Sequence, residues 1–213
     1  MELNENQKTY ALQLAHYKNE KEIIKNLCLH GAKITTPFFV QPSDYKSSFN
    51  AIRIPQYLVA AYFGDKHYLL LHSIEGKDIS GTMGTRRNTA LHLAAENGHL
   101  IAAKAILYHP NITTILNAKN DNHQTPLLLA ASLGHFWITE LLLEYPFSNL
   151  DLYSADSNTI MTPLHAACCK GHTAIVRLCI EKKPEWKNLC FKGQTPLDAA
   201  RRNNYTDIVQ LLE

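Results

Sequence analysis

The sequence predicts an all-α fold, a solenoid of about six helix-turn-helix units. The main observation is a phrase of Thr, then Pro or Ala, then Leu, followed by small residues, which occurs four times. The leucines of these copies, Leu91, Leu127, Leu164 and Leu197, are 36, 37 and 33 residues apart. A turn residue follows each leucine by seven positions. This regular period favours stacked helical repeats over a closed single core.

Each copy carries the signals for two helices joined by a tight turn. Thr is a good N-cap and Pro is best tolerated at the first helical position, so Thr125-Pro126 predicts a helix start. Gly134 can adopt the left-handed conformation that ends a helix. An apolar run at helical spacing begins at Ile138 and predicts the second helix. The other copies place Gly98, Gly171 and Asn204 at the same turn position.

Two weaker copies lie upstream. Leu12 precedes Gly31, and Tyr57 precedes Gly76, by the same 19 residues, which raises the expected number of units from four to six. The units are expected at about residues 8–34, 51–80, 85–118, 121–155, 158–190 and 191–213. Between the first two lies an inserted loop, residues 35–50, which contains four aromatic side chains. These rings either cover the junction of the first two units or contact a partner.

Composition is consistent with one continuous domain over residues 1–213. The net charge is +2 and 46% of the residues are hydrophobic, so neither a basic face for nucleic acid nor a disordered chain is predicted. No apolar run approaches the roughly 20 residues of a membrane-spanning helix, and the first eight residues show no secretory signal. The five cysteines fall mostly at core positions of helices, which favours the reducing cytoplasm over a disulfide framework.

One group of residues resembles a chemical site. His165, Cys168, Cys169 and His172 have spacings that could place them on one helix face, as a metal site or a Cys–His pair. However, His165 occupies the same repeat position as His92, and a turn separates His172 from the others. We therefore predict structural roles for them, with no catalytic residue, no metal and no cofactor, and a chain that is not an enzyme.

The repeated Thr-Pro-Leu-His-x-Ala-Ala phrase, followed by Gly-His, resembles the ankyrin repeat over nearly the whole chain. The resemblance implies a curved stack of antiparallel helix pairs, with projecting loops or short β-hairpins that we call fingers. It also implies that the histidines tie loops and neighbouring repeats together. The family usually has Gly two residues before the motif Thr, and this chain has Arg87, His123, Ile160 and Gly193 there. Irregular or longer loops are therefore expected in the middle of the array.

The resemblance also implies which residues contact partners. In ankyrin arrays these are the two residues before the turn Gly and the residues of the fingers, which line a concave face. On the helices they are Tyr17, Lys18, Tyr62, Phe63, Glu96, Asn97, Ser132, Leu133, Cys169, Lys170, Arg202 and Asn203. On the fingers they are Arg86, Asn88, Asn122, Gln124, Met161 and Lys192.

The large apolar members of this set are the candidate anchors, because such side chains supply much of the affinity at protein interfaces. Leu133 is one of them. For Tyr62 and Phe63, local packing in an atypical repeat is an equal alternative. Trp137 likewise has two interpretations: it contacts either a partner or the next repeat.

Three functional hypotheses follow. The first is a monomeric, cytoplasmic module that binds another protein, with no nucleic acid and no membrane insertion. The second is a targeting domain of a longer enzyme, whose catalytic domain would follow Glu213. The third is a self-contained Cys/His enzyme or metalloprotein. The abundance of Asn, Lys and Ile also resembles proteins of AT-rich genomes, such as ankyrin effectors that intracellular bacteria deliver into host cells.

Overall fold

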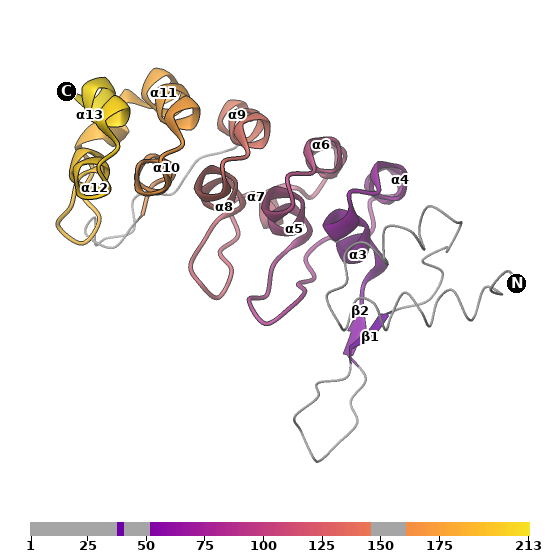
Figure 1. The fold of residues 1–213 in the computed structure, drawn as a ribbon. Coiled ribbons are helices and arrows are strands. Elements are labelled where there is room, and N and C mark those ends of the chain that lie inside the picture. The colour runs from indigo at the N-terminus through magenta and orange to yellow at the C-terminus, as the bar shows by residue number, and fades with distance from the viewer. Residues whose placement is uncertain (1–37, 41–51, 146–160) are drawn as a thin grey trace, which may run out of the picture.

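The computed structural model describes residues 38–40, 52–145 and 161–213 of the chain. Their helices form a stack of antiparallel pairs, with the first helices of the pairs in one row and the second helices in another (Figure 1). The loops between pairs extend from the first row, away from the second row. The unit expected at residues 8–34 lies outside the described residues, as do Tyr17 and Lys18.

Five helix pairs build the described stack. The inner row contains the first helix of each pair: α3 (Gln56–Phe63), α5 (Ala90–Glu96), α8 (Pro126–Leu133), α10 (Pro163–Lys170) and α12 (Pro196–Arg202). The outer row contains α4 (Lys66–Ile74), α6 (Leu100–Leu107), α9 (Phe136–Glu144), α11 (Thr173–Lys182) and α13 (Thr206–Leu212). Two short helices, α7 (Thr113–Leu116) and η1 (Pro184–Asn188), lie in connections. Neighbouring inner helices contact one another along the stack, which confirms the all-α solenoid.

The repeated phrase starts the inner helices as predicted. In α8 and α10 the hydroxyls of Thr125 and Thr162 accept hydrogen bonds from backbone N–H groups three residues ahead, both at 3.2 Å. Pro follows at the first helical position in each of these helices. The cap satisfies an N–H that has no partner inside the helix.

The turn after each inner helix requires an unusual backbone. Gly98 has φ 73°, and a Cβ built on it would lie 2.8 Å from Cε1 of His135. Only glycine satisfies both the left-handed conformation and the close approach of the next repeat. Asn204, which is one of the few other residue types that tolerate this region, takes the turn position in the last pair with φ 59°.

The core runs through the stack as one continuous cluster. The motif leucines Leu91, Leu127 and Leu164 are buried, and Leu197 in the last pair is partly buried. Tyr57 replaces the leucine in α3, where it is buried and its hydroxyl accepts a hydrogen bond from the Gly81 N–H at 2.7 Å. Burial raises the pKa of Tyr57 to about 12, so the ring stays neutral.

Of the irregular or longer loops expected in the middle of the array, the connection from α6 to α8 is indeed long and contains α7, but the turns of the two middle fingers that the structure describes are regular. Arg87 and His123 themselves adopt the left-handed conformation, with φ 52° and 57°. In the first of these fingers, Met83 and Asn88 pair as an antiparallel bridge, with N–O distances of 2.8 and 3.0 Å. This turn contains Gly84 with φ 78°, but the position two residues before the motif Thr is left-handed without glycine. Ile160 lies outside the described residues.

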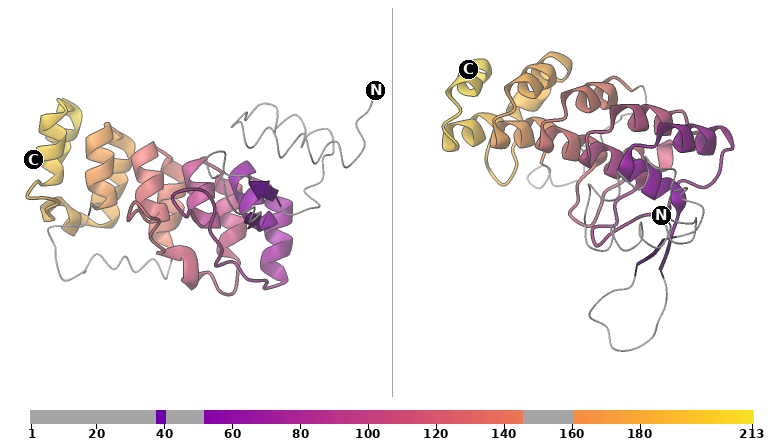
Figure 2. Two further views of the ribbon diagram at one scale, coloured as in Figure 1. Left: turned by 90° about the horizontal axis from the view of Figure 1, so that it is seen from below. Right: turned by 45° about the vertical axis from the view of Figure 1, so that its right-hand side comes forward.

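The inserted loop is also more regular at its edges than predicted. Phe38–Val40 forms strand β1, which pairs in antiparallel fashion with β2, Ile52–Ile54. Phe38 lies opposite Ile54 in this register. The hairpin projects on the same side as the finger loops (Figure 2). The rest of residues 35–50 lies outside the described part, so the alternatives for its aromatic rings stay open.

Candidate binding surface

The predicted contact residues that the structure describes lie along the inner row. Each pair of helix residues ends α3, α5, α8, α10 or α12, and in α5 and α12 the second residue of the pair is the C-cap directly after the helix. The finger residues precede the same helices. We call the surface formed by these helix ends and fingers the concave face. Because consecutive inner helices contact one another, equivalent residues of neighbouring repeats lie side by side on it.

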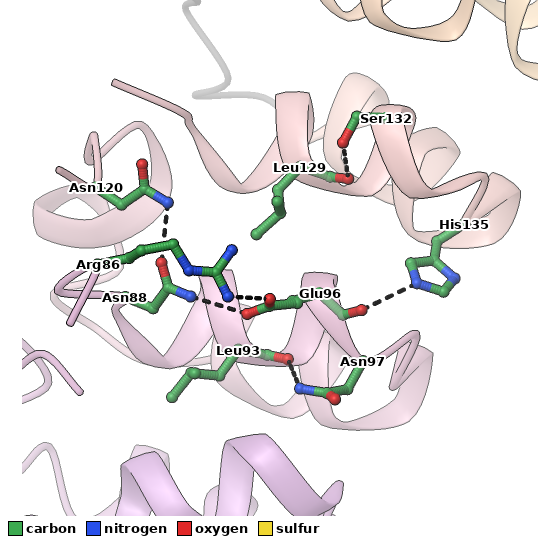
Figure 3. A network of polar contacts seen from close by, with 9 residues as sticks. All are labelled: Arg86, Asn88, Leu93, Glu96, Asn97, Asn120, Leu129, Ser132 and His135. Atoms are coloured by element: carbon green, nitrogen blue, oxygen red, sulfur yellow. Dashed lines mark hydrogen bonds and ion pairs between the residues drawn. The ribbon is translucent and has the colours of Figure 1, made fainter. Parts of the chain in front are cut away.

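A polar network occupies the middle of the concave face (Figure 3). Arg86 forms an ion pair with one carboxylate oxygen of Glu96. The side-chain amide of Asn88 donates to the other oxygen at 2.9 Å. The amide of Asn120, one repeat further along, donates to Oδ1 of Asn88 at 2.9 Å. The Glu96 carboxylate is thus held in one position and its charge is neutralised by Arg86.

This network shows that Asn88, a predicted contact residue, is buried, and it includes Asn120, which was not predicted. Asn88 is only 3% exposed, so it supports Glu96 within the array rather than reaching a partner. Asn120 was missed by the sequence analysis. It is buried, and its Oδ1 accepts hydrogen bonds from the backbone N–H groups of Asn122 and Gln124, both at 3.0 Å. These bonds fix the finger that carries Asn122, which is exposed, and Gln124, which is partly exposed.

The apolar residues differ in exposure. Leu133 is 47% exposed at the end of α8. Tyr62 and Phe63 are partly buried, pack against the core and contact each other edge to face with ring centroids 4.8 Å apart. This supports the packing interpretation for the two rings, and their contact with a partner stays a prediction. Trp137 is exposed on the outer helix α9 and contacts Phe136 edge to face.

The C-terminal part of the concave face is basic. Lys170, Lys192 and Arg202 are exposed, and within residues 52–145 and 161–213 none of them forms an ion pair. Cys169 is half-buried beside Lys170 and Arg202. Burial raises the pKa of the Cys169 thiol, although the two nearby positive charges act to lower it. The thiol is therefore protonated near neutral pH, which makes it a poor nucleophile.

The remaining predicted residues are placed as follows. Asn97 and Asn203 each donate from the side-chain amide to the backbone carbonyl four residues earlier, at 2.9 and 2.8 Å. The Ser132 hydroxyl donates to the carbonyl of Leu129 at 2.9 Å. Met161 is partly buried. Asn203 is exposed, so its side chain can still contact a partner.

The histidines have the structural roles that the resemblance implied. His165 is buried, with Nδ1 2.8 Å from the Thr162 hydroxyl and Nε2 3.2 Å from the carbonyl of Gln194 in the next finger. His172 lies with Nε2 3.1 Å from the carbonyl of Ser132 in the preceding repeat. Each ring therefore connects two repeats.

The cysteine next to these histidines is also part of the core. Cys168 is fully buried, and burial raises its pKa to about 12. In the part of the chain that the structure describes, no group of three or more His, Cys, Asp or Glu is arranged to hold a metal ion. The same residues include no helix long and apolar enough to cross a membrane.

Comparison with known proteins identifies the repeat. A family model for ankyrin repeats, built on three copies, matches residues 58–156 and 147–213. The chain belongs to the ankyrin repeat family. Ankyrin repeats are protein-interaction modules, which implies a protein partner for this ankyrin chain.

The curated relatives are longer proteins that share the ankyrin segment. An ankyrin repeat-containing protein, ITN1, of Arabidopsis thaliana is 29% identical, with 49% of this chain and 21% of the relative covered. A transient receptor potential channel homologue of Caenorhabditis elegans is 30% identical, with 58% and 10% covered. Human diacylglycerol kinase iota is 32% identical, with 43% and 9% covered. The chain thus spans about a fifth or less of each of these relatives.

Proposed function

We propose that this ankyrin chain is a non-enzymatic module that binds a partner protein through its concave face. The observation that supports this most is the row of equivalent side chains at the inner helix ends, which the stack brings side by side. Most of these side chains are not part of the buried core, and they differ from repeat to repeat. Apolar, acidic and basic groups therefore follow one another along one continuous surface, which suits an extended partner segment.

Leu133 gives the most direct test. Leu133→Arg places a charge on an exposed apolar site, so it should weaken partner binding by roughly 1–4 kcal/mol if this residue is an anchor. Tyr108→Arg is the matched control, because Tyr108 is 76% exposed at the end of the outer helix α6. Binding would be measured by calorimetry with a partner captured by the parent chain, and folding by circular dichroism.

For the aromatic pair, both binding and stability have to be measured. Tyr62 and Phe63 pack partly against the core, so their replacement by Ala should lower both partner affinity and thermal stability. Lys187, on the short helix η1, is the control position outside the concave face. Equal binding losses for Leu133→Arg and Tyr108→Arg would contradict the proposed surface.

Other aspects of the function stay predictions. The buried thiols of Cys168 and Cys179 support a reducing, cytoplasmic setting. The continuous core from Tyr57 to Leu212 supports one domain over that part of the chain, and the extension to residues 1–213 and the monomeric state stay predictions from the sequence. The bacterial effector and the targeting domain of a longer enzyme rest on the sequence arguments alone.

A further inference from the structure

The middle and the C-terminal end of the concave face differ in charge. In the middle, Glu96 is paired with Arg86 and bonded to Asn88, so its charge is neutralised. Towards the C-terminus, Lys170 and Arg202 stand at the ends of successive inner helices and have no ion-pair partner within the described ranges. The concave face therefore has an excess of positive charge at this end.

Two acidic groups near this end have partners within the chain, although Asp198 keeps its negative charge. Asp198, on the same helix as Arg202, accepts hydrogen bonds from the Thr195 hydroxyl at 2.7 Å and from its N–H at 2.9 Å. Glu213 pairs with Arg201 at 2.8 Å. The third cation, Lys192, projects from the finger of the last pair, where its ammonium lies 5.3 Å from the centroid of the Phe191 ring.

The apolar anchor site lies next to this basic end. Leu133 ends α8, which contacts α10, the helix that ends at Lys170, and α10 contacts α12, which ends at Arg202. Packed helix axes are about 8–10 Å apart, so Leu133 and Arg202 are separated by roughly 20 Å. An extended peptide advances about 3.3 Å per residue and spans this distance with about six residues.

We propose that the concave face binds an extended acidic segment of a partner protein, with carboxylates at Lys170, Lys192 and Arg202 and an apolar side chain at Leu133. This inference rests on the proposed function and specifies the partner's chemistry. Complementary charge steers the encounter, and the apolar contact at Leu133 adds burial that a free anion cannot supply. A nucleic acid would require more phosphate contacts than these three cations provide.

The test begins with a display library of random peptides selected on the parent chain. Selected peptides should combine Asp or Glu with a large apolar residue, and their affinity should fall as salt is raised. The double variant Lys170→Glu/Arg202→Glu should bind them at least about tenfold more weakly. The matched control is Lys104→Glu/Arg177→Glu, which makes the same charge change on the outer helices α6 and α11 and should alter affinity by less than about twofold.

A second readout locates the bound peptide. Cys169 lies beside Lys170 and Arg202 and is partly exposed, so a bound acidic peptide should slow its alkylation by iodoacetamide. The rate of Cys169 alkylation without peptide serves as the reference, and both rates are measured above neutral pH because the thiol is protonated near neutral pH. Mass spectrometry reads the rates.

The outcomes separate this inference from the proposed function. Selected peptides without acidic residues, equal losses in both double variants, or unchanged Cys169 alkylation would overturn the acidic-segment proposal and leave the binding module standing. Displacement of the peptides by equimolar polyuridylate would assign the cations to nucleic acid and also overturn it. Failure to select any peptide would contradict the proposed function itself.

Discussion

Asn120 should be the most important single polar residue of the finger region. Its side chain makes three hydrogen bonds: one to Asn88 at 2.9 Å and two from backbone N–H groups at 3.0 Å. Asn120→Ala removes all three and leaves buried groups without partners. At about 1 kcal/mol per bond, we expect a loss of roughly 3 kcal/mol in the free energy of unfolding. For a chain of this size that corresponds to about 6–12 °C in melting temperature.

The same finger provides the control. Asn122 is exposed, and only its backbone takes part in the network, so Asn122→Ala should change the free energy of unfolding by less than about 0.5 kcal/mol. Thermal and urea unfolding would be followed by circular dichroism. Because Asn88 and Asn120 share one bond, the double variant should be less destabilised than the sum of the two single variants by about 1 kcal/mol. Equal effects of Asn120→Ala and Asn122→Ala would refute the role assigned to this network.

Three further predictions concern the histidines and the turns. Burial lowers the pKa of His165 from its usual 6.5, so the unfolded chain binds this proton more strongly than the folded chain does. The contribution of neutral His165 to the free energy of unfolding is therefore complete above about pH 6.5 and is lost as the pH falls towards the lower pKa of the folded state. Melting temperatures between about pH 7.5 and 5 should thus fall less steeply in His165→Gln than in the parent, and equal slopes would contradict this effect of burial. In urea unfolding, Gly134→Ala should lower the free energy of unfolding more than Gly84→Ala does. Both glycines have positive φ, but only a Cβ at Gly134 would approach a histidine ring, at 2.9 Å. Equal losses in the free energy of unfolding would exclude that contact. His123→Gly should raise the free energy of unfolding by up to about 1 kcal/mol by relieving the left-handed backbone, and a decrease would show that the side chain contributes more than the strain costs.

The helices were predictable from the sequence because their signals are local. Thr162 and Pro163 start a helix, and Gly171 ends it, through atoms only a few residues apart. The role of His165 followed from its repetition in the sequence, since a residue at the same place in two repeats, as His92 also is, suggests a shared bond to the next finger. Both rings approach the carbonyl of the residue before the next motif Thr.

The fingers were not predictable in the same way. A positive φ at Arg87 costs about 1–2 kcal/mol by itself, so the sequence favoured an irregular loop there. Backbone pairing of Met83 with Asn88, and the bond from Asn120 to Asn88, offset that cost. The bond joins residues 32 positions apart, and nothing in the local sequence of either finger indicates the pairing. For the same reason, the burial of Asn88 could not be foreseen.

Photo-crosslinking tests the central claim, that the concave face is the binding surface, most directly. A photoreactive residue would replace Leu133 on the concave face or, in a separate variant, Tyr108 on the outer row, and each chain would be irradiated with a selected peptide. Both positions are well exposed, so each can react with whatever lies against it. We predict a crosslink to the peptide from position 133 and none from position 108. Crosslinking from position 108 alone would place the partner on the outer helices and contradict the account.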